Sequence, residues 1–178
     1  MIWRGPMATS ALTQLLTGTR WGDLDVLVVD LPPGTGDIQL TMSQKIPVAG
    51  AVIVTTPQDI ATLDARKALK MFEKLDIALL GLVENMAVHV CSNCGHAEHI
   101  FGEGGAVRMS AQYGVPVLGS LPLQVAIRAQ GDAGTPIVAA QPDSAAALAY
   151  REAARALLAR LDTRPKVRSG IMASLLGG

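Results

Sequence analysis

LDVLVVDLPPGTGD, the sequence of residues 24–37, joins an apolar run to a loop rich in proline and glycine. The run at residues 26–29 is unbroken and rich in β-branched side chains, which is typical of a strand buried on both faces of a parallel sheet. Asp30 then places a carboxylate at the carboxyl end of that strand, where open α/β sheets bind their ligands. We interpret Asp30 as the acid that holds a nucleotide-bound Mg²⁺ through water, and the loop after it as a phosphate-sensing switch. A surface aspartate before a tight turn is the alternative.

Strand-like and helix-like segments alternate along the rest of the chain. Strands are expected at residues 50–54, 77–85 and 116–119, and helices at 6–17, 38–44, 62–72, 104–113, 125–130 and 144–161. This alternation specifies a parallel sheet with right-handed crossovers, so the expected fold class is α/β, with a mostly parallel sheet flanked by helices. Residues 163–178 carry basic side chains and end in two glycines, which predicts a disordered tail.

Composition excludes several classes of function. Apolar residues make up 49% and charged residues 17% of the 178 residues, which favours a folded domain with its own core. Basic and acidic residues both total 15, so the net charge gives no argument for nucleic acid or for an anionic membrane. No apolar run approaches the roughly 18 residues that a membrane-spanning helix needs. We therefore expect neither nucleic acid nor a membrane among the partners.

Both cysteines and all three histidines lie within residues 89–99. Cys91 and Cys94 have the spacing at which two thiolates share one metal through a tight turn, and Gly95 permits that turn. Two cysteines so arranged are not a disulfide scaffold; they fit a reducing compartment, and the predicted location is cytoplasmic. A structural tetrahedral site needs four ligands, so two ligands must come from elsewhere.

Several completions of this site remain open. Histidines of the same chain could complete a zinc site. The pair could be a redox dithiol, although thioredoxin-like motifs open a helix and this one lies in a polar insertion at residues 86–102. Two copies of the chain could meet across a two-fold axis and offer four thiolates to one iron–sulfur cluster. A reduced surface turn with incidental histidines is the remaining possibility.

The lysine-containing phosphate loop, G-x-x-x-x-G-K-[ST], does not occur in this sequence. The chain therefore combines a predicted Mg²⁺-ordering acid and switch with no phosphate cradle. Two interpretations follow, either a nucleotide-free relative of the P-loop proteins or the C-terminal part of a longer protein. We leave open whether this chain is itself an enzyme, and expect it to bind nucleotide weakly or not at all.

Ten short stretches follow one another in a fixed order: WRGPM (3–7), WGDLD (21–25), VDLPPGTGD (29–37), TTPQ (55–58), ENM (84–86), CSNCG (91–95), IFG (100–102), GGA (104–106), YGVP (113–116) and LPL (121–123). With them the chain resembles the C-terminal part of the Mrp-type (ApbC-like) iron–sulfur cluster carriers, P-loop ATPases related to the MinD/ParA group. MinD/ParA relatives do not, as a rule, share the cysteine turn. The resemblance implies a partial P-loop NTPase fold over residues 1–162, with a C-x-x-C insertion at residues 86–102.

The resemblance also implies nucleotide-binding roles. Asp30 resembles the acid that ends the Walker B strand and orders Mg²⁺. Asn85 resembles the residue that contacts adenine, with a plain strand-end turn as its alternative. The segment around Pro122 resembles the other wall of the adenine pocket, with a purely structural proline as its alternative. The loop that couples the γ-phosphate of ATP to the dimer interface is matched by Pro33, Gly34, Thr35 and Gly36.

The cysteines complete the implied function. Cys91 and Cys94 resemble the pair that binds a [4Fe–4S] cluster bridging two subunits of a homodimer. The family holds a labile cluster and passes it to apo iron–sulfur proteins, with ATP gating the dimer in the full-length protein. One alternative is a MinD/ParA-like ATPase relative whose cysteines bind structural zinc. Another is a metal-binding domain that works without nucleotide.

Overall fold

A three-stranded parallel sheet forms the centre of the computed structural model, which describes residues 5–31, 36, 39–40, 46 and 48–163. Its order is β1-β2-β5, with β1 at Ala51–Thr55, β2 at Leu79–Glu84 and β5 at Val117–Ser120. Thr55 pairs with Glu84, and Glu84 pairs with Ser120, so the carboxyl ends of all three strands lie at one edge. The strands predicted at residues 50–54, 77–85 and 116–119 are confirmed.

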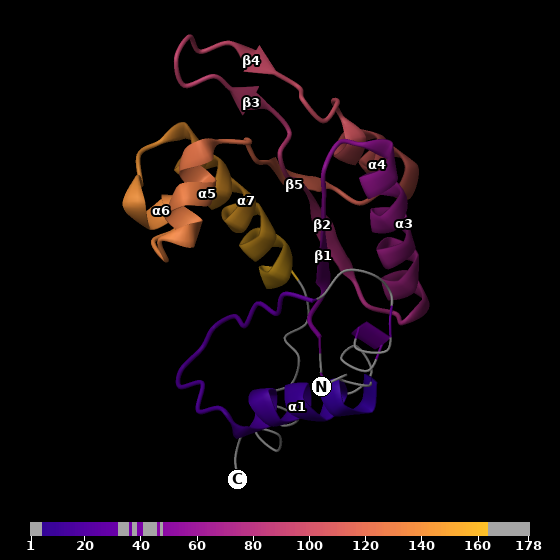
Figure 1. The fold of residues 1–178 in the computed structure, drawn as a ribbon. Helices are drawn as coiled ribbons and strands as arrows, with labels where there is room; N and C mark the ends of the chain where they lie inside the picture. The colour runs from indigo at the N-terminus through magenta and orange to yellow at the C-terminus, as the bar shows by residue number, and fades with distance from the viewer. Residues whose placement is uncertain (1–4, 32–35, 37–38, 41–45, 47, 164–178) are drawn as a thin grey trace.

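Helices cover both faces of this sheet (Figure 1). α3 (Asp59–Lys74) and α4 (Gly105–Tyr113) pack on one face, and α7 (Ala145–Asp162) packs on the other against β5 and β2. Beside α7 lie α5 (Val125–Asp132) and α6 (Ile137–Ala140), of which α6 was not predicted. The predicted helices at residues 62–72, 104–113, 125–130 and 144–161 are therefore confirmed, and so is the α/β fold class.

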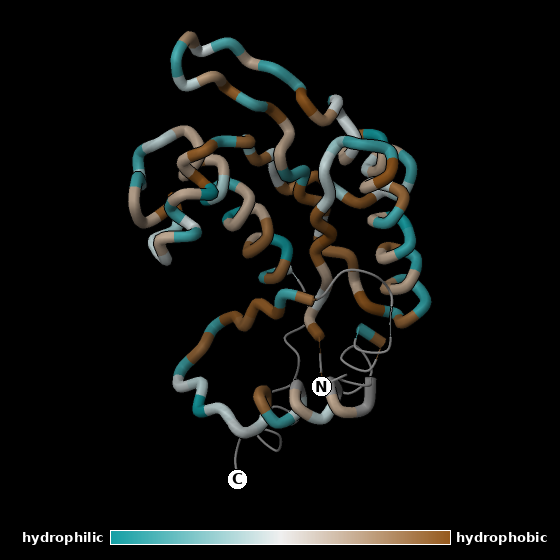
Figure 2. The backbone as a smooth tube through the Cα atoms, in the orientation of Figure 1, coloured by the Kyte–Doolittle hydropathy of each residue, from teal (hydrophilic) through white to brown (hydrophobic). Residues whose placement is uncertain are grey.

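The core fills the space between the sheet and the helices α3 and α4. Leu69 of α3, Leu82 of β2 and Met109 of α4 are fully buried there. On the other face, small residues let α7 approach closely, since a Cβ added to Gly119 would lie 2.8 Å from Cβ of Ala153. Hydrophobic residues follow one another along the strands, and also along the irregular segment that leaves the N-terminal helix (Figure 2).

The predicted strand at residues 26–29 is wrong in this structure. These residues have no regular secondary structure, and Val28 is 78% exposed. A strand persists only when a neighbour satisfies its backbone hydrogen bonds, and within the described residues none pairs with this run. The segment leaves α1 (Gly5–Gly18) and lies at the end of the sheet where β1 begins, well away from the carboxyl edge (Figure 1).

Two other expectations fall largely outside the described residues. Of the helix predicted at residues 38–44, only residues 39 and 40 are described, and both are helical. Of the predicted tail at residues 163–178, only Thr163 is described, where it caps the end of α7.

The helix predicted at residues 6–17 is confirmed as α1. Among the described helices, none is both long enough and apolar enough to cross a membrane.

Candidate functional site

Two of the predicted nucleotide-binding residues lie on neighbouring segments at the carboxyl edge of the sheet. The backbone N–H of Asn85 donates to the carbonyl of Thr55 at 2.7 Å, and that of Leu121 donates to the carbonyl of Glu84 at 2.8 Å. Asn85 directly follows the end of β2, and Pro122 directly follows Leu121, the residue bonded to Glu84. Both residues are partly exposed. The structure places these two segments side by side, and the roles of Asn85 and Pro122 toward adenine stay predictions.

The side chain of Asn85 already has one local partner. Its Oδ1 atom accepts a hydrogen bond from the backbone N–H of Met86 at 3.0 Å. Met86 has a φ of 55°, in the left-handed region that side chains rarely adopt. The bond to Asn85 helps hold this turn, so Asn85 does act as a turn residue at the end of the strand. The same bond leaves the amide Nδ2 of Asn85 as the group that could donate to a ligand.

The cysteines lie in a hairpin that projects beyond this edge (Figure 1). β3 (His89–Val90) pairs antiparallel with β4 (Ala97–Glu98). Between these strands the N–H of Cys91 donates to the carbonyl of His96, and the N–H of Gly95 donates to the carbonyl of Cys91, both at 2.9 Å. Gly95 has a φ of 72°, which explains the glycine at this point of the turn. Both thiols are free, and Cys94 is exposed.

The turn favours the thiolate form of Cys91. The backbone amides of Cys94 and Asn93 lower the pKa of the Cys91 thiol, and the Cys94 thiol lowers it further. Backbone N–H groups stabilise a negative charge on sulfur, and the thiolate is the form that binds metals. The local chemistry of this turn therefore suits metal or cluster binding.

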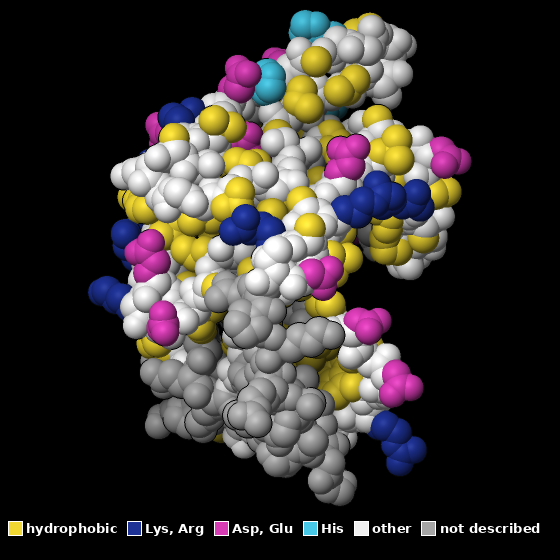
Figure 3. All heavy atoms as spheres, turned by 180° about the vertical axis from the view of Figure 1, so that it is seen from behind, with side chains coloured by type: hydrophobic (Ala, Val, Ile, Leu, Met, Phe, Trp, Pro, Cys, Tyr) yellow, Lys and Arg dark blue, Asp and Glu magenta, His cyan; other side chains and the backbone are white. Residues whose placement is uncertain are grey.

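Two of the three histidines near the cysteines, His89 and His99, hydrogen-bond to backbone carbonyls. Nδ1 of His89 lies 3.0 Å from the carbonyl oxygen of Leu123, and Nδ1 of His99 lies 2.8 Å from that of Ala87. Across the described part of the chain, no three His, Cys, Asp or Glu side chains are grouped so as to hold a metal ion. The two cysteines of the turn are therefore the donors that the local geometry brings together. Histidine side chains are visible at the hairpin end of the space-filling view (Figure 3).

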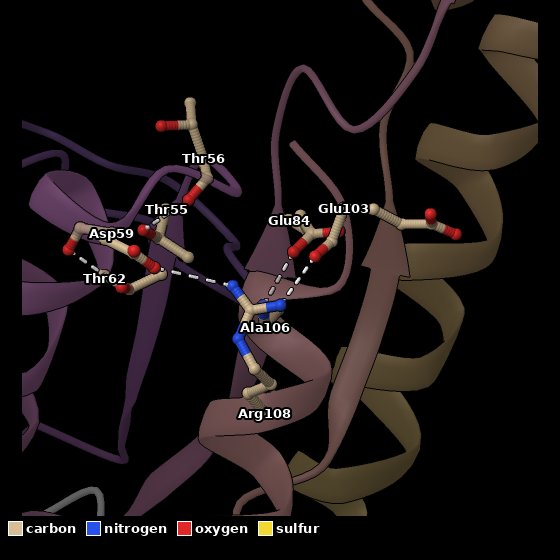
Figure 4. A network of polar contacts seen from close by, with 8 residues as sticks. All are labelled: Thr55, Thr56, Asp59, Thr62, Glu84, Glu103, Ala106 and Arg108. Atoms are coloured by element: carbon tan, nitrogen blue, oxygen red, sulfur yellow. Dashed lines mark hydrogen bonds and ion pairs between the residues drawn. The ribbon is translucent and has the colours of Figure 1, made fainter. Parts of the chain in front are cut away.

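Glu84, at the end of β2, is a buried residue next to the site to which the sequence motifs assign no role. Its side chain is only 5% exposed, and Oε2 accepts a hydrogen bond from the backbone N–H of Ala106 at 2.6 Å (Figure 4). Ala106 belongs to the first turn of α4, so this bond joins the two ends of the cysteine insertion. A carboxylate at the end of an otherwise apolar strand was the only signal available in the sequence.

Asp30 lies apart from these residues. It is exposed, in the irregular segment at the opposite end of the sheet. Of the predicted switch loop, Pro33, Gly34 and Thr35 fall outside the described residues, and Gly36 is exposed. The structure thus places the segments of Asn85 and Pro122 side by side, whereas the irregular segment that contains Asp30 lies at the other end of the sheet (Figure 1). The roles of Asp30 and of the loop stay predictions.

Comparison with known proteins gives the family. A family model described as the ParA-type NUBPL iron-transfer P-loop NTPase matches residues 1–158. An iron-sulfur cluster carrier protein of Pseudomonas fragi is 65% identical over 154 residues, which cover 86% of this chain and 54% of that protein. The chain thus spans about half the length of this relative.

Solved structures agree with the family match. A nucleotide-binding protein of Archaeoglobus fulgidus, solved with ADP, is 38% identical with a TM-score of 0.61, over 70% of this chain and 53% of that one. The cell division ATPase MinD of Pyrococcus furiosus is 24% identical with a TM-score of 0.63, over 83% of this chain and 58% of that one, and shows the fold alone. The predicted resemblance to MinD/ParA-related iron–sulfur proteins is confirmed. The chain belongs to the ParA family of P-loop NTPases, in its NUBPL iron-transfer branch.

Proposed function

We propose that this chain is the cluster-holding part of an iron–sulfur cluster carrier, which binds a labile cluster at Cys91 and Cys94 and passes it to apo iron–sulfur proteins. The observation that carries the proposal is the cysteine turn itself. Its two free thiols lie at the end of a projecting hairpin, and backbone amides favour the thiolate of Cys91. An exposed cluster can be handed to another protein, and the related Pseudomonas fragi protein is named as a carrier.

The number of thiols favours a dimer. Each chain offers two cysteines, whereas a [4Fe–4S] cluster is held by four thiolates. A homodimer whose two turns meet across a two-fold axis supplies all four without further residues. We therefore assign the cargo as a [4Fe–4S] cluster bridging two subunits. Free thiols at this position suit a reducing compartment such as the cytoplasm.

The proposal includes a nucleotide-binding site. Asn85 and Pro122 would form the adenine side of a site for ATP and Mg²⁺, and the Archaeoglobus fulgidus neighbour solved with ADP supports nucleotide binding by this fold. Asp30 and the loop at residues 33–36 would serve the phosphate side. In this scheme residues 1–162 form the C-terminal part of the NTPase domain, with the insertion at residues 86–102. ATP then gates cluster transfer in the longer protein.

Anaerobic reconstitution with iron and sulfide tests the cargo. The wild-type chain should turn brown with the visible absorption of an iron–sulfur cluster, and Cys91→Ser or Cys94→Ser should abolish it. His96→Phe, a change in the same turn, serves as the control and should retain the cluster. Uptake of one zinc ion per chain in a histidine-dependent manner, with no cluster, would instead support the structural zinc alternative.

A further inference from the structure

The strand that leads into the cysteine turn is bound to the segment that follows β5. The N–H of Ala87 donates to the carbonyl of Leu121 at 2.9 Å, and the N–H of Leu123 donates to the carbonyl of Val88 at 2.8 Å. His89 and Leu123 then form a parallel β-bridge. The pairing of β2 with β5 is thus continued beyond the sheet, as far as the root of the hairpin.

The imidazole of His89 adds a side-chain bond to this ladder. Its Nδ1 atom lies 3.0 Å from the carbonyl oxygen of Leu123, and the residue is only partly exposed. A carbonyl oxygen can only accept, so Nδ1 must carry the proton and donate. This fixes the tautomer and the ring plane of the neutral His89 side chain. Within the described residues no three His, Cys, Asp or Glu side chains are grouped to hold a metal ion, and the bond to the carbonyl of Leu123 is the contact that the structure gives this ring.

The two ends of this bond lie next to the two halves of the proposed site. Leu123 follows Pro122, the predicted adenine wall, and His89 precedes Cys91 by two residues. We propose that His89 is a positioning residue, which fixes the cysteine turn to the segment at residues 121–123 and sets how firmly the cluster is held. This inference rests on the proposed carrier function. Through the bond between His89 and Leu123, a displacement of residues 121–123 would also move the cysteine turn.

Cluster retention tests the proposal. His89→Phe keeps a ring and loses the donor, whereas His89→Asn keeps a donor, Nδ2, close to the position of Nδ1. Reconstituted His89→Phe should contain as much iron and sulfide as wild type but lose its cluster to a chelator about tenfold faster, the size of effect seen when the support of a metal ligand is removed. His89→Asn should restore the wild-type rate. His96→Phe is the matched control, because His96 makes no side-chain hydrogen bond within the described residues, and it should leave the rate unchanged.

Three results would overturn the proposal. Complete loss of the cluster in both His89 variants, as in the cysteine variants, would make His89 a ligand. Equal rates in His89→Phe and wild type would show that the bond positions nothing. An equal acceleration in His96→Phe would show that the effect is not specific to the bond with Leu123.

A second measurement needs no cluster. In the cluster-free wild-type chain with ¹⁵N-labelled histidine, NMR at a pH where His89 is neutral should show the Nδ1–H tautomer. Amide exchange at Cys91 should be faster in His89→Phe than in wild type. The opposite tautomer, or unchanged exchange, would contradict the positioning role. Failure of the wild-type chain to take up a cluster, with these two results as expected, would contradict only the proposed function.

Discussion

Glu84 Oε2 accepts a hydrogen bond from the backbone N–H of Ala106 at 2.6 Å, across 22 residues of sequence. Glu84 is 5% exposed and Ala106 is completely buried, so water cannot replace either partner. The acceptor is a carboxylate and the donor is one of the first amides of α4, an arrangement that the helix dipole favours. Because the cysteine insertion runs from one partner to the other, this single bond closes its base (Figure 4).

Removal of that carboxylate should destabilise the fold. Glu84→Ala leaves the N–H of Ala106 buried without an acceptor, which costs about 1–3 kcal/mol of unfolding free energy. Glu84→Gln retains an amide oxygen in the same place and should lose less. Urea unfolding followed by circular dichroism measures both. Glu103→Ala, a carboxylate with no side-chain hydrogen bond in the described structure, is the control and should stay near wild type; a loss as large as that of Glu84→Ala would rule out a specific role for the bond.

The glycine beside this bond is required for close packing. A Cβ added to Gly105 would lie 2.7 Å from the carbonyl oxygen and 2.9 Å from the Cα of Pro57, and backbone atoms cannot move aside cheaply. Gly105→Ala should therefore lower the unfolding free energy by about 1–3 kcal/mol. Gly131 in α5 has nothing within 4 Å of an added Cβ. Gly131→Ala should be neutral or stabilising by up to about 1 kcal/mol, because alanine loses less backbone freedom on folding. Equal losses in thermal unfolding would contradict this account.

Local sequence predicted most of the fold because most elements are set by local pattern. The apolar runs at β1 and β2 and the amphipathic stretch at α3 were placed within a few residues of their observed bounds. The strand predicted at residues 26–29 is wrong, although the apolar pattern of these residues is as clear as that of β1. Strand formation depends on a partner strand, and hydrophobicity alone does not specify that a partner is at hand.

In the site too, the sequence predicted only the features that depend on local structure. The C-x-x-C spacing identified Cys91 and Cys94 because a tight turn is a local structure. The bonds from Glu84 to Ala106 and from His89 to Leu123 join residues 22 and 34 positions apart, and only the folded chain brings them together. The spacing of the histidines likewise could not show that His89 and His99 hydrogen-bond to backbone carbonyls.

The cap of α7 offers a local test of the helix packed on the far face of the sheet. Ser144 Oγ accepts from the backbone N–H of Ala147 at 3.2 Å and donates to the carbonyl of Gln141 at 2.8 Å. Ser144→Ala removes both bonds and should cost about 1 kcal/mol of unfolding free energy. Ser144→Asp keeps the acceptor that caps the helix and should recover most of it. If chemical unfolding shows the two variants to be equal, the hydroxyl does not act as a cap.

The lowered pKa of Cys91 predicts how the cysteine turn responds to pH. Alkylation follows the thiolate fraction, so Cys91 in the folded, metal-free chain should reach half its maximal rate at a lower pH than in urea, where the backbone amides of Cys94 and Asn93 no longer face its sulfur. Mass spectrometry of iodoacetamide-treated protein across this pH range measures both curves.

The same shift fixes the sign of a stability effect. A thiol whose pKa is lower in the folded chain than in the unfolded chain stabilises the fold above the ordinary cysteine pKa of 9.0, and this contribution is lost as the pH falls through the lowered value.

Cys94→Ser provides the control for the alkylation experiment, because it keeps the backbone amide that is the main cause of the pKa shift of Cys91. Cys91 in that variant should still react at lower pH than in urea. Coincident folded and unfolded curves would show that the turn does not favour the thiolate.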